Sequence, residues 1–167
     1  MKTAGVSLAI VLALALQTTL VYASGFSEAI NLVLVVVMGA ALLFGPVAGM
    51  FTGSIAGLAQ DSLSGGVVGV GGLASTLAGF VAGWMAAQFI VTSFVSRLFV
   101  MFVGSLVYGL CVLGLNFMID LRPVDVPYAT AFTQASVNAI LGAVCFRMIE
   151  TLPDTMHRRR LRRGMRR

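Results

Sequence analysis

Charge is what this sequence has least of. Only 10% of its 167 residues are Asp, Glu, Lys or Arg, while 59% are hydrophobic, and a soluble domain carries about 25% charged residues. No charged residue lies between Glu28 and Asp61, and none lies between Asp61 and Arg97. Apolar stretches of this length match the hydrocarbon core of a bilayer. The composition therefore predicts an integral membrane protein and excludes a water-soluble enzyme domain.

Groups that carry chemistry are scarce as well. The chain has one histidine, His157, and two cysteines, Cys111 and Cys145. Thiols in apolar helices more often act as small apolar residues than as a disulfide or a metal pair. The sequence contains no CxxC, HExxH, P-loop, GxSxG or paired-carboxylate pattern. We therefore expect no catalytic residue, no metal and no cofactor, and the protein is predicted not to be an enzyme.

What the sequence does have is a series of apolar stretches, most of them near the 20 residues that a spanning helix needs. These runs do not alternate in polarity, which excludes a β-barrel. The expected fold class is an all-α integral membrane protein: a six-transmembrane-helix bundle over residues 1–152, followed by a basic cytoplasmic tail at 153–167. The helices are expected at about residues 3–23, 29–44, 46–61, 67–92, 98–119 and 128–149.

Two of these assignments had alternatives. The first run could be a signal peptide cleaved after Val21-Tyr22-Ala23, but its length favours a retained helix. The stretch between Glu28 and Gln60 is too long for one span, and Gly45-Pro46 is the expected break because proline suits the first turn of a helix. One tilted helix in its place would reduce the count to five.

The basic residues predict the orientation. With six spans, ten of the eleven basic residues fall on one side, and Arg122 is the exception. Positive charge marks the cytoplasmic side, so both termini are expected in the cytoplasm. The arginines Arg158, Arg159, Arg160, Arg162 and Arg163 of the tail are expected to adsorb to anionic lipids. Contact with an acidic protein is the alternative, and a charge run alone does not predict nucleic-acid binding.

A register of glycines spaced by four or eight residues surrounds Asp61. A step of four residues keeps side chains on one face of a helix, so the glycines of the third helix form a groove. The groove could pack inside the protein's own bundle or could dock a partner's transmembrane helix. The register consists of Gly45, Gly49, Gly53, Gly57, Gly65 and Gly69.

Asp61 is unusual because it ends a short span, where the helix dipole disfavours a negative charge. A charge at mid-bilayer costs about 2.5–3.5 kcal/mol on insertion scales. One interpretation is an interfacial carboxylate that accepts hydrogen bonds from Ser62 or Ser64. The others are a proton or cation relay, and a role in partner binding or in fixing the fold.

Amide side chains lie within or at the ends of several spans. Such groups usually form hydrogen bonds between helices, although they could also line a small-molecule pocket. The polar intramembrane positions singled out are Gln17, Asn31, Asn116 and Asn138.

One segment has the pattern G-x3-G-x3-D-x3-G-x3-G. It is Gly53-Ser54-Ile55-Ala56-Gly57-Leu58-Ala59-Gln60-Asp61-Ser62-Leu63-Ser64-Gly65-Gly66-Val67-Val68-Gly69. It resembles the signature of the MreD rod-shape-determining family, whose motif residues correspond to Gly53, Gly57, Asp61, Gly65 and Gly69. Gln17 and Asn31 also look like family positions, whereas Ile30 departs from the proline that is usual there.

The resemblance implies a non-enzymatic scaffold of the bacterial inner membrane that supports peptidoglycan synthesis and rod shape. The partners implied are MreC, RodA and a class B penicillin-binding transpeptidase, with MreB reached indirectly. The implied fold is similar to the membrane S-components of energy-coupling-factor transporters. A vitamin-binding subunit of such a transporter is thus the competing function, although a polar-aromatic pocket is not evident with a single tryptophan, Trp84.

Overall fold

The protein is seen here in a computed structural model that describes residues 2–21, 30–65, 67–88, 93–119, 132–145 and 147. Within these ranges the chain is helical and contains no strand. The all-α fold class is therefore confirmed. The expected basic tail and the residues between the last two helices lie outside the described residues.

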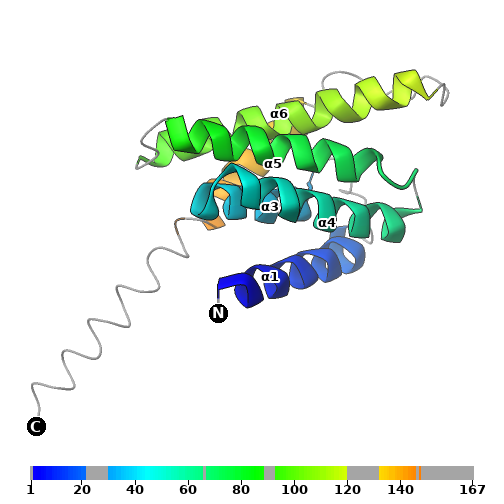
Figure 1. The fold of residues 1–167 in the computed structure, drawn as a ribbon, viewed down its shortest axis with the longest axis horizontal. Coiled ribbons are helices and arrows are strands. Elements are labelled where there is room, and N and C mark those ends of the chain that lie inside the picture. Colours follow the sequence, from blue (N-terminus) through cyan, green and yellow to red (C-terminus); the bar gives the residue numbers. More distant parts are fainter. Residues whose placement is uncertain are drawn as a thin grey trace, which may run out of the picture.

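The helices run in alternating directions and pack side by side (Figure 1). The helix Leu32–Phe44 is labelled α3, as in Figure 1. The short helix Phe132–Cys145 is called the C-terminal helix here. The elements are α1 (Lys2–Leu16), a π-helical turn η1 (Gln17–Val21), α3 (Leu32–Phe44), α4 (Pro46–Ser64), α5 (Val70–Gln88), α6 (Phe94–Met118) and the C-terminal helix.

The break at Gly45-Pro46 lies where the sequence predicts it. Gly45 has φ +91°, a value that favours glycine. Its N–H donates to the carbonyl of Ala41 at 2.9 Å, and its carbonyl accepts the N–H of Gly49 at 3.0 Å. One residue thus ends α3 and starts α4, and Pro46 occupies the first turn of α4, where it needs no N–H partner.

Other boundaries differ from the expected ones. α4 continues to Ser64, three residues past the expected end, and ends at Gly65, which is in the left-handed conformation with φ +68°. α5 begins at Val70 because Gly69 has φ +109°, outside helical values. α3 begins at Leu32, not at residue 29, because Asn31 is extended and caps the helix. These differences follow from single residues with special backbone angles.

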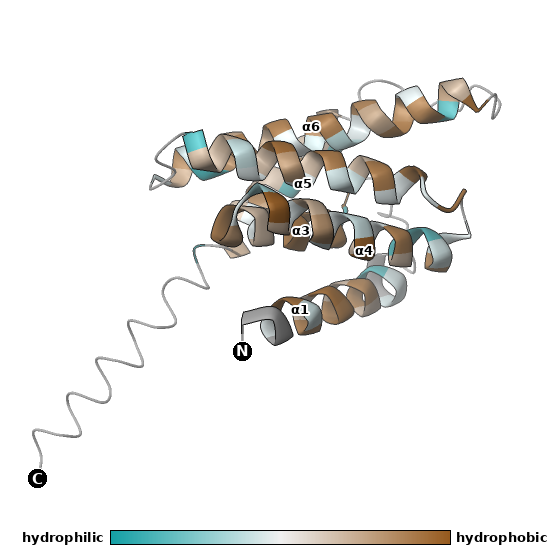
Figure 2. Ribbon diagram, in the orientation of Figure 1, coloured by the Kyte–Doolittle hydropathy of each residue, from teal (hydrophilic) through white to brown (hydrophobic). Residues whose placement is uncertain are grey.

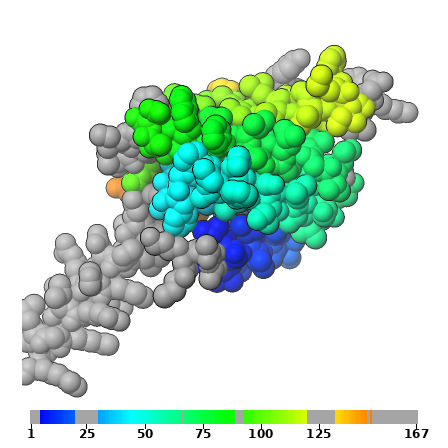
Figure 3. All heavy atoms as spheres, in the orientation of Figure 1, coloured from blue at the N-terminus to red at the C-terminus, as the bar shows by residue number. Residues whose placement is uncertain are grey.

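α3 is the central helix of the bundle. Its buried side chains contribute to two core clusters, one shared with α5, α6 and the C-terminal helix, and one shared with α1 and α4. Leu34 and Met38 pack in the first cluster, and Val33 and Val37 pack in the second. Much of the remaining core is alanine and glycine, so the helix backbones lie close together. α1 lies at one edge of the bundle and α6 at the opposite edge (Figure 3).

Two of the helices, α5 and α6, are long and apolar enough to cross a membrane. Three shorter apolar helices accompany them, at Gly5–Thr19, Leu32–Phe44 and Phe132–Cys145. Most of the residues in the helices are hydrophobic (Figure 2), and many large apolar side chains are exposed. On α4, for example, Val47, Phe51 and Ile55 are all at least 60% exposed. Apolar surface on this scale is expected where a protein meets lipid.

Candidate functional site: the glycine seam, the Asp61 cap and the amide cluster

The glycine register of α4 faces α5. A Cβ atom on Gly49 would collide with the carbonyl oxygen of Gly79, and one on Gly53 would collide with the carbonyl oxygen of Ser75. On Gly57 it would lie 2.7 Å from the Cα atom of Gly72, well inside van der Waals distance. The three glycines therefore let two backbones touch. We call this line of contact the glycine seam.

The α5 side of the seam is also built from small residues. A Cβ atom on Gly79 would collide with the carbonyl oxygen of Gly49, and one on Gly83 would lie 2.5 Å from the Cα atom of Pro46. Gly71, Ser75, Gly79 and Gly83 are spaced by four, as are the glycines of α4. Our sequence analysis did not identify this second register, although its spacing carries the same signal. α4 and α5 form the most extensive helix pair of the bundle.

Asp61 caps the N-terminus of α5. Its Oδ2 atom accepts the N–H of Gly69 at 2.8 Å and the N–H of Gly72 at 3.0 Å. Gly69 occupies the N-cap position, because its carbonyl accepts the N–H of Leu73, but glycine has no side chain to cap with. The carboxylate at the end of the preceding helix supplies the missing acceptor. It also places a negative charge at the positive end of the α5 dipole.

The hydrogen-bond donors expected for Asp61 were wrong. The Ser62 hydroxyl donates to the carbonyl of Leu58 at 2.9 Å, and the Ser64 hydroxyl donates to that of Gln60 at 2.7 Å. Both serines still belong to α4, so their hydroxyls bond within their own helix. The free N–H groups at the start of a helix are stronger partners for a carboxylate.

The five motif residues therefore serve one arrangement. Gly53 and Gly57 admit the backbone of α5, Gly65 ends α4, and Gly69 starts α5 with a positive φ. Asp61 joins the two helix ends, and Gly71 has no room for a side chain because a Cβ atom would collide with the Oδ1 atom of Asp61. Together they close α4 and α5 into a tight antiparallel hairpin.

Three of the four amides singled out in the sequence meet at the N-terminus of α3. Gln17 bonds the chain at two points, since its Nε2 donates to the carbonyl of Ile30 at 2.9 Å and its Oε1 accepts the N–H of Leu32 at 2.8 Å. Asn31 Oδ1 accepts the N–H of Leu34 at 2.9 Å. The N–H of Asn31 donates to Oδ1 of Asn138 at 2.9 Å. We call this set the amide cluster.

The amide cluster connects three helices that are distant in sequence. Gln17, Asn31 and Asn138 are 3%, 2% and 0% exposed, and they come from η1, the cap of α3 and the C-terminal helix. Their carbonyl oxygens accept N–H groups that the first turn of α3 would otherwise leave unpaired.

Asn116, the fourth amide, is half-buried near the end of α6 and makes no hydrogen bond to these three. The Nδ2 atom of Asn138 is buried without a partner in the described part of the chain.

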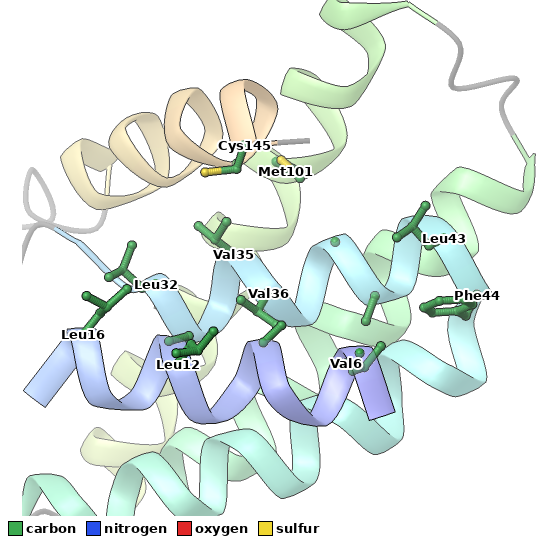
Figure 4. A pocket seen from close by; sticks show the side chains of 16 residues that line it. Val6, Leu12, Leu16, Leu32, Val35, Val36, Leu43, Phe44, Met101 and Cys145 are labelled. Carbon is green, nitrogen blue, oxygen red and sulfur yellow. The ribbon is translucent and has the colours of Figure 1, made fainter. Parts of the chain in front are cut away.

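A cavity lies on another face, between α1, α3 and the C-terminal helix (Figure 4). Its volume is about 490 Å³, and its walls are aliphatic side chains, glycine and alanine, with Phe44, Met101 and Cys145. A vitamin site needs polar groups that fix the ligand, and this lining offers none. The competing vitamin-transport function is not supported.

Chemically reactive groups do not gather within the described ranges. Among those residues, no three of His, Cys, Asp or Glu lie close enough to hold a metal ion. Cys111 and Cys145 are both free thiols. His157 and the arginine run lie outside the described residues.

These observations define a class: within the described ranges the protein is all-helical with an apolar surface, its polar side chains cap helix ends, and its glycines join helices. The sequence matches the family described as rod shape-determining protein MreD over residues 2–153. The chain therefore belongs to the MreD family, a family of membrane proteins that determine rod shape and are not known as enzymes. No curated protein and no solved structure matches the chain, so the expected likeness to transporter S-components stays a prediction.

Proposed function

We propose that this protein is a non-enzymatic scaffold of the cell-elongation machinery in the bacterial inner membrane. The observation that carries the proposal is the family match, which extends over residues 2–153. The proposed partners are MreC, and with it RodA and a class B penicillin-binding transpeptidase, with MreB reached indirectly. Through them the protein would support peptidoglycan synthesis and rod shape.

The structure favours a role in assembly over a role in chemistry. The carboxylate of Asp61 and the amide oxygens of Gln17 and Asn31 accept backbone N–H groups of the protein itself, which favours a structural role for them over proton transfer or substrate binding. The glycine seam is filled by α5. Partner helices would therefore contact outer faces, such as the exposed row of Val47, Phe51 and Ile55 on α4.

The proposed topology has six spans with both termini in the cytoplasm. The alternating helix directions seen in Figure 1 support this arrangement. A periplasmic reporter should be active when fused after residue 24 and inactive when fused after residue 164. An active reporter at the second position would contradict the topology.

A pull-down from membranes tests the scaffold function. The tagged full-length protein is isolated in mild detergent and all co-purifying proteins are identified by mass spectrometry, with an unrelated multi-span protein as the control. MreC should be enriched only with the MreD-family chain. Recovery of a stoichiometric vitamin together with an ATPase complex, and no MreC, would overturn the proposal.

A further inference from the structure

The cavity between α1, α3 and the C-terminal helix is an open groove in a lipid-facing surface. α3 forms its floor, and α1 and the C-terminal helix form its walls (Figure 4). Val6 and Leu12 line it from α1, Val36 and Leu43 from α3, and Cys145 from the C-terminal helix. We call it the α3 groove.

The lining of the α3 groove selects an apolar occupant. None of its residues has a side chain that forms strong hydrogen bonds or carries a charge. A polar ligand would lose its hydration there without gaining hydrogen bonds, which costs several kcal/mol per polar group. A hydrocarbon chain loses nothing by entering.

The groove has the length of one membrane leaflet. Its α1 wall extends from Gly5 to Leu16, and at 1.5 Å per residue this is about 17 Å. Half of a hydrocarbon core is about 15 Å thick. Beyond Leu16 and Leu32 come Gln17 and Asn31 of the amide cluster, where the apolar lining ends. A chain that belongs to one leaflet matches this extent.

The groove is also too short for a partner's transmembrane helix. Such a helix needs about 30 Å of apolar contact, and the α1 wall of the groove gives about 17 Å. The cavity volume of about 490 Å³ falls within the roughly 300–1,000 Å³ of sites that hold small ligands.

Positive charge lies at one end of the α3 groove. The N-terminus of α1 lies near the end lined by Val6 and Phe44, and its helix dipole is positive there. Arg147 follows Cys145 by two residues, is exposed, and its guanidinium stacks over the Phe94 ring at 5.6 Å. In the described part of the chain the only carboxylate is Asp61, at the opposite end of α4.

From these dimensions and charges, we propose that the α3 groove binds a single anionic phospholipid. One acyl chain lies along α3, and the phosphate lies at the end marked by the α1 N-terminus and Arg147. This site differs from adsorption of the arginine tail to the membrane surface. In the α3 groove an acyl chain lies between helices and stays bound in detergent.

Two glycines make the site testable without disturbing the core. Gly39 on the floor and Gly5 on the α1 wall have no atom within 4 Å of an added Cβ, so a larger side chain there enters the groove itself. Gly114 on α6 also has open space and lies outside the groove, so Gly114→Leu is the matched control for Gly39→Leu and Gly5→Leu.

The experiment is native mass spectrometry of the full-length protein in mild detergent with added phosphatidylglycerol or phosphatidylcholine. Wild type and Gly114→Leu should each retain one phosphatidylglycerol and little phosphatidylcholine. Gly39→Leu and Gly5→Leu should lower the bound fraction by about tenfold, because the added side chain fills space that the acyl chain needs. Circular dichroism should show that all variants remain folded.

Four results would overturn the proposal. Equal retention of phosphatidylglycerol by all four proteins would show that the lipid does not occupy the groove, and equal retention of phosphatidylcholine would remove the role of charge. Loss of a co-purifying protein from Gly39→Leu, with unchanged lipid, would assign the groove to a partner helix. In wild type, a phosphatidylglycerol with a photoreactive acyl chain should label α1 and α3. Labelling confined to other helices would also contradict the proposal.

Discussion

Replacing Gly57 by alanine is the smallest change that tests the glycine seam. It adds one methyl group, and the structure gives its surroundings in detail. The new Cβ atom would lie 2.7 Å from the Cα atom of Gly72 and 2.8 Å from the carbonyl oxygen of Gly71. Ordinary contacts begin near 3.4 Å, so α4 and α5 must separate by roughly 0.6–0.7 Å. Backbone atoms cannot rotate out of the way as a side chain can.

The sign of the effect is informative because two contributions oppose each other. Alanine is favoured over glycine inside a helix by about 1 kcal/mol. Overpacking a close contact costs about 1–3 kcal/mol, and separated helices also lose dispersion contacts along the seam. We expect a net loss of about 1–2 kcal/mol in the free energy of unfolding. Gly57→Leu should be worse, and cells that depend on it should lose their rod shape.

Gly114→Ala provides the control. Gly114 lies on α6 with no atom within 4 Å of its added Cβ, so only the helix propensity acts and stability should stay equal or rise by up to about 1 kcal/mol. The measurement is denaturant unfolding of the purified proteins in detergent micelles, followed by circular dichroism. If Gly57→Ala proved as stable as Gly114→Ala, the close packing inferred for the seam would be wrong.

Three further predictions concern the polar groups. Asp61→Ala should lower the free energy of unfolding by about 1–2 kcal/mol, because the N–H groups of Gly69 and Gly72 lose their acceptor. Asp61→Asn keeps an acceptor oxygen and should lose less stability, and equal losses of the two variants in denaturant unfolding would contradict the capping role. Gln17→Leu leaves the N–H of Leu32 without its acceptor and should lower the free energy of unfolding by about 1–3 kcal/mol in the same assay. Unchanged stability would show that the amide cluster does not stabilise the fold. Asn116→Leu, outside that cluster, should change stability by less than about 0.5 kcal/mol, and a loss as large as that of Gln17→Leu would show that its environment has been misjudged.

The sequence predicts the all-helical fold class and the break between α3 and α4 well, because apolar length and proline position are local signals. Gly45-Pro46 marks the end of one helix and the start of the next, and both residues lie where the chain reverses. The start of α5 was harder to predict, since a positive φ at Gly69 is invisible in a run that contains several glycines.

Partners of polar groups were the least predictable part. The sequence singles out Asp61, Gln17, Asn31 and Asn138, but it does not say which of them meet. Asn31 and Asn138 are 107 positions apart and meet only because the C-terminal helix packs beside the cap of α3. Asp61 bonds forward to the next helix and not to its own turn. Tertiary packing decides both outcomes, and periodicity within one helix carries no information on it.

The capping bond of Asp61 has a consequence for how the protein enters the bilayer. Its two N–H donors lie 8 and 11 residues later in the chain, so they do not exist while α4 alone has emerged from the ribosome. The seam glycines likewise have no partner until α5 is present. We therefore expect α4 and α5 to insert into the membrane together as a hairpin, and truncation between them should yield a segment that the cell degrades.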